Sequence, residues 1–250
     1  MNHFKKMAYP YVAWISVMVV APMLLIVMYA FIEQGNDVTT FKFTLSNFTR
    51  FFSDSVYTDV LYRSLYVALI TTLICLLIGY PAAYIIAMAK PKHKAALVLL
   101  ITFPTWINML VRTYAWLGIL QDNGIINSFL GLFGIEPIQM IYTNFAVILG
   151  MVYNFVPFMI LQIYSALDKM DKSYLEAASD LGANRVQSFL RVTFPMSLPG
   201  VISGITLVFL PAVSSFFIPK LLGGGQSALI GNAIETQFLT AGDWGFSCAI

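Results

Sequence analysis

Five long apolar segments dominate this sequence and limit what it can fold into. They lie near residues 9–32, 60–89, 95–119, 145–167 and 198–219. The hydrocarbon core of a bilayer is about 30 Å thick, and a helix of about 20 apolar residues crosses it. Only helices and closed barrels satisfy every backbone polar group in lipid, and the segments lack the alternating pattern of barrel strands. We therefore expect an all-α, polytopic membrane protein.

A sixth apolar segment begins near Trp244 and is cut off by the end of the chain. We expect six spans, with the sixth truncated here and the native protein longer. The first segment follows Lys5 and Lys6, as in a signal peptide, but it exceeds the roughly 7–15 apolar residues of such a signal. We expect residues 1–59 to form a retained N-terminal transmembrane helix and an external segment, and residues 60–250 to form the core.

Charged residues are scarce, which excludes several classes of protein. They make up 10% of the sequence, against about 25% in soluble domains. A net charge of +2 and the lack of basic motifs argue against nucleic-acid binding. Cys75 and Cys248 lack metal-ligand spacing, and His3 and His93 lie outside the apolar segments. We expect no catalytic residue, metal or cofactor in this chain.

The basic residues sort to one side of the predicted topology. With the N-terminus inside, the inner segments hold Lys5, Lys6, Lys90, Lys92, Lys94, Lys169, Lys172, Arg185 and Arg191. The outer segments hold few basic residues and most of the acids. Loops rich in Lys and Arg stay in the cytoplasm. The sorting predicts a multi-pass protein of the bacterial cytoplasmic membrane, surrounded by lipid, with a cytoplasmic N-terminus.

The largest predicted inner loop has the pattern of two short helices. Ser173 and Glu176 have the spacing of a capping box at the start of the first helix. Gly182 suits the left-handed residue that ends a helix. We expect the second helix over 184–193, with Pro195 stopping it. The pattern predicts a rigid helix–glycine–helix elbow.

The spacing in this loop resembles the EAA loop of bacterial ABC importer permeases. Glu176, Ala177 and Ala178 are followed after three residues by Gly182, and after nine more by Val192-Thr-Phe-Pro. The family pattern ends in I-x-L-P, so two positions differ by apolar exchanges. The resemblance implies a type I ABC importer transmembrane domain with its coupling loop at 168–197.

The resemblance also implies roles and partners. Glu176 would meet polar groups in a cleft of an ABC ATPase, Ala177 and Ala178 would permit close approach, and Gly182 would set the turn. The ATPase subunits would bind ATP, so the chain itself is a transport subunit and not an enzyme. A second permease subunit and an external substrate-binding protein would complete the complex.

Further stretches are similar to the spermidine/putrescine branch of these permeases. They are Gly79-Tyr-Pro, 106–116, 214–223, 230–232 and 243–246. The resemblance implies translocation of polyamines, with ABC permeases for other small solutes as the alternative.

Prolines inside three predicted spans point to a possible substrate path. Pro104, Pro157 and Pro211 each free a carbonyl four residues earlier and bend the helix. Such a kink either heals against a neighbouring helix or faces a water-filled path. Trp106, Asn108, Tyr153 and Asn154 would offer an ammonium group aromatic faces and neutral oxygens. We interpret these four residues as candidate path residues.

Three charged residues are candidates for a gate or for attracting substrate from outside. Arg112 lies within the third predicted span. It either snorkels, pairs with an outer acid, or acts as a gate whose charge repels a cation. Glu235 and Asp243 are predicted outside, where they are either solvated acids or attract a polycation.

Two other classes of membrane protein fit the sequence less well. An ion-driven secondary carrier often has carboxylates within its spans, and the five predicted spans contain none. A membrane-embedded enzyme needs a nucleophile–base pair or a metal cluster at membrane depth. The triple glycine Gly223-Gly-Gly lacks the lysine of a phosphate-binding loop, so the energy source must lie in another polypeptide.

Overall fold

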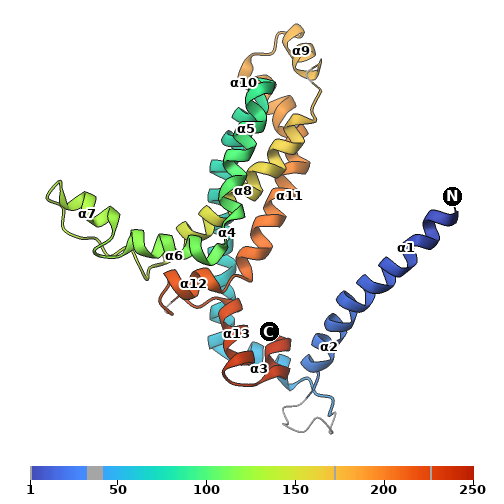
Figure 1. Cartoon of the computed structure of the whole chain (residues 1–250), viewed down its shortest axis with the longest axis vertical. Helices are drawn as coiled ribbons and strands as arrows, with labels where there is room; N and C mark the ends of the chain where they lie inside the picture. Colours follow the sequence, from blue (N-terminus) through green and yellow to red (C-terminus); the bar gives the residue numbers. More distant parts are fainter. Residues whose placement is uncertain (1, 33–41, 172, 226) are drawn as a thin grey trace. The chain divides into compact units, whose positions relative to one another are not determined.

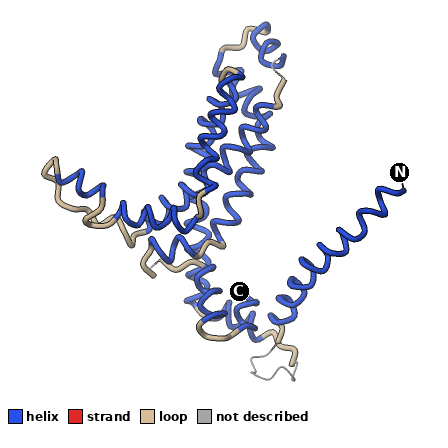
Figure 2. The backbone as a smooth tube through the Cα atoms, viewed as in Figure 1, coloured by secondary structure: helices blue, strands red, loops and turns tan. Residues whose placement is uncertain are grey.

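The protein is all-helical over the residues that the computed structural model describes. Those residues are 2–32, 42–171, 173–225 and 227–250. Figure 2 shows helices along this trace, and the β pairing in it amounts to one isolated bridge between Ile32 and Phe43. The predicted fold class is confirmed.

The helices form two compact units, each with its own packing. Unit 1 combines Met1–Leu61 with Ile230–Ile250, and unit 2 is Tyr62–Leu229. The predicted division into residues 1–59 and 60–250 stays a prediction.

Unit 1 begins with one long helical run. It consists of α1 (Asn2–Ile15), a π-helical turn η1 (Ser16–Val20) and α2 (Ala21–Ala30). The stretch Ala8–Ala30 is long and apolar enough to cross a membrane, and none of its most apolar window is buried within the protein. An apolar helix exposed on all sides requires lipid or another protein around it. The first predicted span is confirmed as a helix of spanning length.

Unit 1 also contains three short helices and the first residues of α4. They are α3 (Ser46–Ser53), α13 (Ile230–Leu239) and α14 (Trp244–Ala249). Asn47 of α3 donates from Nδ2 to the carbonyls of Ala30 and Ile32, both at 3.0 Å, and so caps the end of α2. Helix α14 starts where the sixth span was predicted. Its six residues are too few to cross a membrane, so the sixth span stays a prediction.

A column of four helices forms the body of unit 2 (Figure 1). The helices are α4 (Ser55–Met88), which begins in unit 1, α5 (Pro91–Thr102), α8 (Asn144–Asp168) and α11 (Phe194–Val213). Helix α8 lies at the centre, where Met151, Met159 and Ile163 are fully buried. Helices α4 and α8 and the run Arg185–Val213 have spanning length and hydropathy. These helices confirm the second, fourth and fifth predicted spans.

Helices α8 and α11 pack most extensively, at glycines of α11. A Cβ atom at Gly200 would lie 2.6 Å from the Cβ of Ala166 and 2.7 Å from the carbonyl oxygen of Gln162. A Cβ atom at Gly204 would lie 2.6 Å from the sulfur of Met159. Small residues allow two helix backbones to approach closely in a membrane protein. The two glycines therefore fix the distance between α8 and α11.

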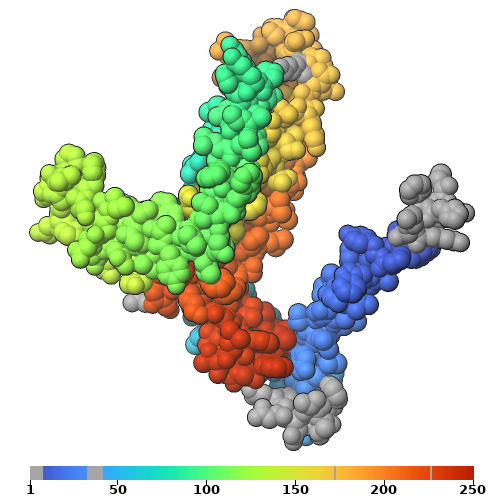
Figure 3. Space-filling model, viewed as in Figure 1, coloured from blue at the N-terminus to red at the C-terminus, as the bar shows by residue number. Residues whose placement is uncertain are grey.

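The third predicted span, 95–119, is not one straight helix. Helix α5 passes into a 3-10 turn η2 (Phe103–Trp106), and α6 (Met109–Leu120) and α7 (Ile125–Gly131) follow. The two parts meet at 88°, and α6 and α7 project from the side of the column (Figure 3). Pro104 cannot donate a backbone hydrogen bond in η2, which confirms the predicted bend. Asn108 then starts a new helix, because its Oδ1 accepts from the N–H of Leu110 at 2.8 Å.

The prediction that Pro195 ends a short helix is wrong. Helix α10 (Arg185–Ser188) continues through a π-helical turn η3 (Phe189–Thr193) into α11. Pro195 is in the first turn of α11, directly after the π-helical turn. Proline is tolerated there, because the irregular turn before it already breaks the regular hydrogen-bond pattern. The fifth span is therefore continuous with the second arm of the elbow.

The close contact of α8 and α11 predicts a stability effect. Gly200→Ala should lower the free energy of unfolding of the purified protein by about 1–3 kcal/mol, because the new methyl group would collide with backbone atoms of α8. Gly118→Ala on α6 is the matched control, since nothing lies within 4 Å of its Cβ position. Thermal unfolding in detergent would measure both. Equal stability of the two variants would contradict the packing argument.

Candidate functional site

The predicted elbow lies at one end of unit 2, beyond the ends of α5 and α8 (Figure 1). We call α9 (Ser173–Asp180), Gly182 and α10 together the elbow. Ser173 is the first residue of α9, and its N–H donates to Oδ1 of Asp171 at 2.9 Å. This backbone hydrogen bond holds the pKa of Asp171 below its usual value. The predicted capping box of Ser173 and Glu176 is therefore replaced by a cap from Asp171.

Gly182 ends α9 in the left-handed conformation that the sequence predicts. Its φ is +78°. The N–H of Ala183 donates to the carbonyl of Ala178 at 3.0 Å, and the N–H of Gly182 donates to that of Ser179 at 2.9 Å. This pair of bonds is a Schellman motif. No atom lies within 4 Å of a Cβ placed at Gly182, so the backbone conformation and not crowding requires glycine.

A capping box does occur in the elbow, at its second arm. Oδ1 of Asn184 accepts from the N–H of Gln187 at 2.9 Å, and Oε1 of Gln187 accepts from the N–H of Asn184 at 3.0 Å. The reciprocal pair fixes where α10 begins. The Asn-x-x-Gln spacing in the sequence is the signal that would have located it.

The elbow presents its predicted contact residues at the surface. Glu176 and Ala177 are exposed and Ala178 is half-buried. Large apolar side chains lie on these short helices or next to them in sequence: Tyr174, Leu181, Val186 and Leu190 are each more than half exposed. An exposed apolar patch within a polar loop is typical of a surface that binds another protein.

Aromatic side chains connect the second arm of the elbow to α4. The ring of Phe189 packs edge-on against Tyr80 and Tyr84 of α4, with centroids 5.8 and 5.6 Å apart. The hydroxyl of Tyr80 bonds to that of Ser197 at 2.8 Å. Movement of α10 would therefore carry α4 with it, because these contacts make one packed body. Gly79-Tyr80-Pro81 entered the sequence analysis only as a family signature, so its structural role was missed.

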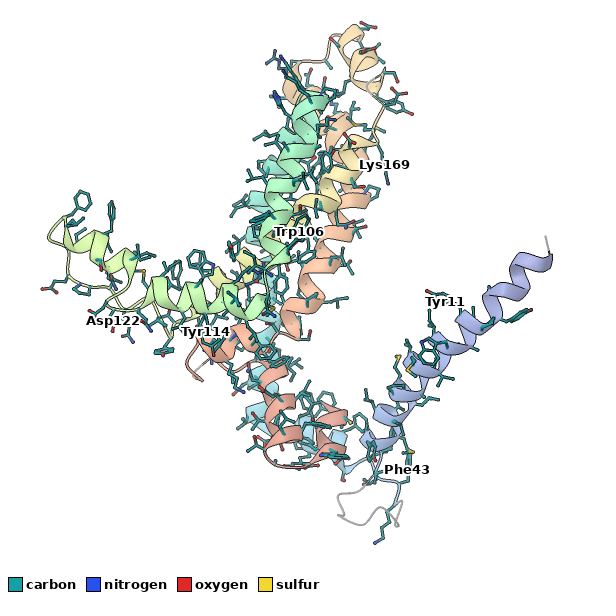
Figure 4. All side chains as sticks on the ribbon, viewed as in Figure 1. Tyr11, Phe43, Trp106, Tyr114, Asp122 and Lys169 are labelled. Carbon is teal, nitrogen blue, oxygen red and sulfur yellow. The ribbon has the colours of Figure 1, made fainter. Side chains whose placement is uncertain are left out.

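An ion pair closes the same end of the column. Nζ of Lys94, in the first turn of α5, lies 2.5 Å from Oδ1 of Asp168 at the end of α8. Both side chains are partly exposed, so we expect a small contribution to stability, about 0–1 kcal/mol. The pair holds the ends of α5 and α8 together beside the elbow. Figure 4 labels the neighbouring Lys169 there.

The four candidate path residues lie in two different environments. Trp106 is 71% exposed at the break between α5 and α6 (Figure 4), and Asn108 is the exposed cap of α6. Tyr153 is half-buried on α8 and packs edge-on against Trp116 of α6, with ring centroids 5.4 Å apart. Asn154 is buried beside it. Trp116 is thus a neighbour of the candidate path that sequence reasoning did not select.

Asn154 and Arg112 are buried with unused hydrogen-bonding capacity. Asn154 donates to the carbonyl of Gly150 at 2.8 Å, while its Oδ1 has no partner. Arg112 is only 9% exposed, and its Nε and Nη1 have no partner. An unsatisfied buried polar atom costs about 1–3 kcal/mol. The expectation that Arg112 pairs with an outer acid is therefore wrong for the part of the chain described, while the snorkelling and gate interpretations stay predictions.

Arg112 lies on α6 one helical turn before Trp116, and Tyr153 of α8 is close enough to interact with it electrostatically.

Asp243 has a structural role inside unit 1. Its side chain is 4% exposed, and Oδ2 lies 2.8 Å from Nη1 of Arg50. Oδ1 accepts from the N–H of Phe246 and caps α14, while the guanidinium of Arg50 lies 4.1 Å from the Phe246 ring centroid. Arg50 thus neutralises the carboxylate. Glu235 is half-buried on α13, with a partner of its own.

No group of three His, Cys, Asp or Glu side chains that could hold a metal ion occurs among the described residues. The rigid, exposed elbow is joined to a helical column, an arrangement that suits the transmission of movement from the elbow to the helices.

Comparisons with known proteins agree with this geometry. Residues 76–250 match the family model described as binding-protein-dependent transport system inner membrane component. The spermidine/putrescine transport system permease protein PotB of Haemophilus influenzae is 41% identical, with 100% of this chain and 88% of the relative covered. PotB of Escherichia coli is 42% identical, with 95% of this chain and 87% of the relative covered.

A solved structure shares the fold. A chain of a bacterial alginate ABC transporter, in complex with an alginate pentasaccharide-bound periplasmic protein, superposes with a TM-score of 0.74. Its sequence is 18% identical, and the match covers 98% of this chain and 86% of that chain. The family match and the apolar helices together make this a multi-pass inner membrane protein, and the chain belongs to the family of binding-protein-dependent transport system inner membrane components.

Proposed function

We propose that this protein is a permease subunit of an ATP-driven importer that carries polyamines such as spermidine or putrescine. The observation that carries the proposal is the exposed elbow, which has the spacing of the EAA loop and a left-handed Gly182. The chain that contains this elbow is 41% identical to a spermidine/putrescine permease. The substrate class rests on the printed names of such relatives.

The elbow would couple the permease to an ABC ATPase. Glu176 and Ala177 are exposed where a partner can reach them, and a short, capped helix transmits a push without deforming. Because α10 continues through η3 into α11, and Phe189 of η3 packs on α4, a displacement of the elbow would tilt both spans as a rigid body. ATP would be bound by the partner ATPase and not by this chain.

The elbow would then lie in the cytoplasm, together with the N-terminus. The lysines at the turn between α4 and α5 and those near the elbow support this orientation, because basic loops remain inside. A second permease subunit and an external binding protein would complete the importer.

Unit 2 offers a polyamine neutral partners and a positive gate. The predicted spans contain no Asp or Glu that would hold a polycation too tightly to release. Tyr153 and Trp116 present aromatic faces, and Asn154 has a free carbonyl oxygen. Arg112 beside them would repel the cation until the helices rearrange, which fits a gate that is closed at rest.

The coupling role predicts the effect of removing the left-handed glycine. Gly182→Val should leave the protein in the membrane but reduce ATPase association and uptake together, because a β-branched residue resists φ of +78° at a cost of about 1–3 kcal/mol. Gly134→Val is the matched control, with φ of +73° and equally open space. Pull-down of the ATPase would measure association. Wild-type association and uptake in Gly182→Val would remove the coupling role.

The orientation predicts a labelling pattern in intact cells. In a background with Cys75 and Cys248 replaced, a cysteine at Asn123 should react with an impermeant maleimide, and one at His93 should react only after lysis. Both positions are exposed. Asn127, in the same predicted outer segment as Asn123, would be a poor labelling position, because it is buried and bonded to Ile138. Labelling of the His93 position from outside would invert the topology.

The proposed path predicts graded effects at Tyr153. Tyr153→Ala should reduce uptake of radiolabelled spermidine or putrescine about five- to thirtyfold, the equivalent of about 1–2 kcal/mol. Tyr153→Phe should reduce it mildly, because the ring still packs on Trp116. Tyr114→Ala, at an exposed tyrosine of α6, is the control. Wild-type uptake in Tyr153→Ala would exclude this residue from the path, and uptake of another solute instead of polyamines would overturn the substrate.

A further inference from the structure

Helices α6 and α7 form an arm that leaves the column at about the thickness of a bilayer core. Helix α5 has 12 residues and η2 has four, so together they rise about 26 Å. The hydrocarbon core of a bilayer is about 30 Å thick. In the orientation that the proposed function requires, the lysines around Pro91 place the start of α5 at the inner edge of that core. Because the chain then bends by 88°, an upright α5 sends the arm along the outer edge of the core.

The end of the arm, residues 121–138, is a compact unit that we call the tip. Asn127 is buried within it. Its Nδ2 donates to the carbonyls of Gln121 at 3.3 Å and Ile138 at 3.0 Å, and its Oδ1 accepts from the N–H of Ile138 at 3.0 Å. Both ends of the tip are therefore tied to one side chain, which fixes the surface that the tip presents.

The tip presents mainly apolar side chains. From Ile125 to Ile135, a stretch that the structure describes in full, Ser128 is the one exposed polar residue. Lys and Arg are absent from the tip, and its acids, Asp122 and Glu136, flank this stretch. An exposed apolar surface of this kind marks a contact with a membrane or a protein. The exposed large apolar side chains of the tip are Ile125, Phe129, Leu132, Phe133, Ile135 and Ile138.

The two sides of the arm differ, as in a helix that lies in a membrane interface. In Figure 4, Asp122 lies on the side of the arm away from the elbow, and ring side chains of the α7 region project on the opposite side. With the elbow in the cytoplasm, these rings face the bilayer interior and the acid faces water. A protein interface has hydrogen-bonding groups around its apolar core. The stretch 125–135 exposes only the hydroxyl of Ser128 for that purpose, which favours lipid over a protein partner.

We propose that the tip inserts into the outer leaflet of the membrane and contacts phospholipid acyl chains through Leu132 and its exposed apolar neighbours. This inference rests on the proposed function for its orientation. Lipid contact would hold the far end of α6, the helix that carries Arg112 and the Trp116 ring that packs on Tyr153. The bilayer would then support the position of the candidate gate.

The test measures the surroundings of spin labels on the tip, in the permease–ATPase complex in lipid nanodiscs. In a background with Cys75 and Cys248 replaced, a nitroxide on a cysteine at Leu132 should collide more often with oxygen, which concentrates in lipid, than with a water-soluble nickel chelate. Leu132 is 80% exposed, so the label displaces no packed side chain. Asn123 is the matched control, exposed in the same tip beside Asp122. There the order of the two collision rates should reverse.

The other outcomes separate this proposal from the proposed function. A label at Leu132 that collides mainly with the nickel chelate would place the tip in water and overturn the insertion. Low collision rates with both reagents would mean that protein covers the tip, such as the second permease subunit, and would overturn it too. Polyamine uptake by the same complex is measured separately. Lipid exposure at Leu132 in a complex without uptake would overturn the proposed substrate and leave the insertion standing.

Discussion

The close approach of α8 and α11 is the contact on which the rest of unit 2 depends. Gly200 and Gly204 let α11 lie against Gln162, Ala166 and Met159 without intervening side chains. In lipid, helices gain little from burying apolar surface, so close packing between backbones supplies much of their attraction. Because α8 and α11 are fixed together, they form one rigid column that ends at the elbow.

That column explains how a short surface helix can influence distant residues. The elbow continues through α10 and η3 into α11, and Phe189 joins it to Tyr80 of α4. The π-helical turn is the one irregular point on this route, directly before Pro195. Phe189 lies in this turn and packs on Tyr80 and Tyr84, so the irregular point is itself held against α4.

The buried polar groups differ in how completely they are satisfied. Asp243 is paired with Arg50 and also caps α14, so it stabilises one arrangement of unit 1. Arg112 and Asn154 keep unsatisfied atoms beside Tyr153. Such atoms disfavour the conformation that contains them, and a rearrangement that supplies partners would be favoured by comparison. Three of the four unsatisfied buried side-chain atoms among the described residues thus lie at the candidate path and gate, and the fourth is Oγ of Ser215.

The sequence by itself determined the class of fold, four of the spans, and the left-handed glycine of the elbow, because hydropathy, length and glycine at a cap are local properties. Only the tertiary structure decided how sharp the bend after Pro104 is, the continuity past Pro195, the burial of Arg112 and the pairing of Asp243 with Arg50. A proline ends, bends or starts a helix according to the turns and neighbours around it. A charge is exposed, paired or stacked according to residues far away in sequence, which one chain read in order does not reveal.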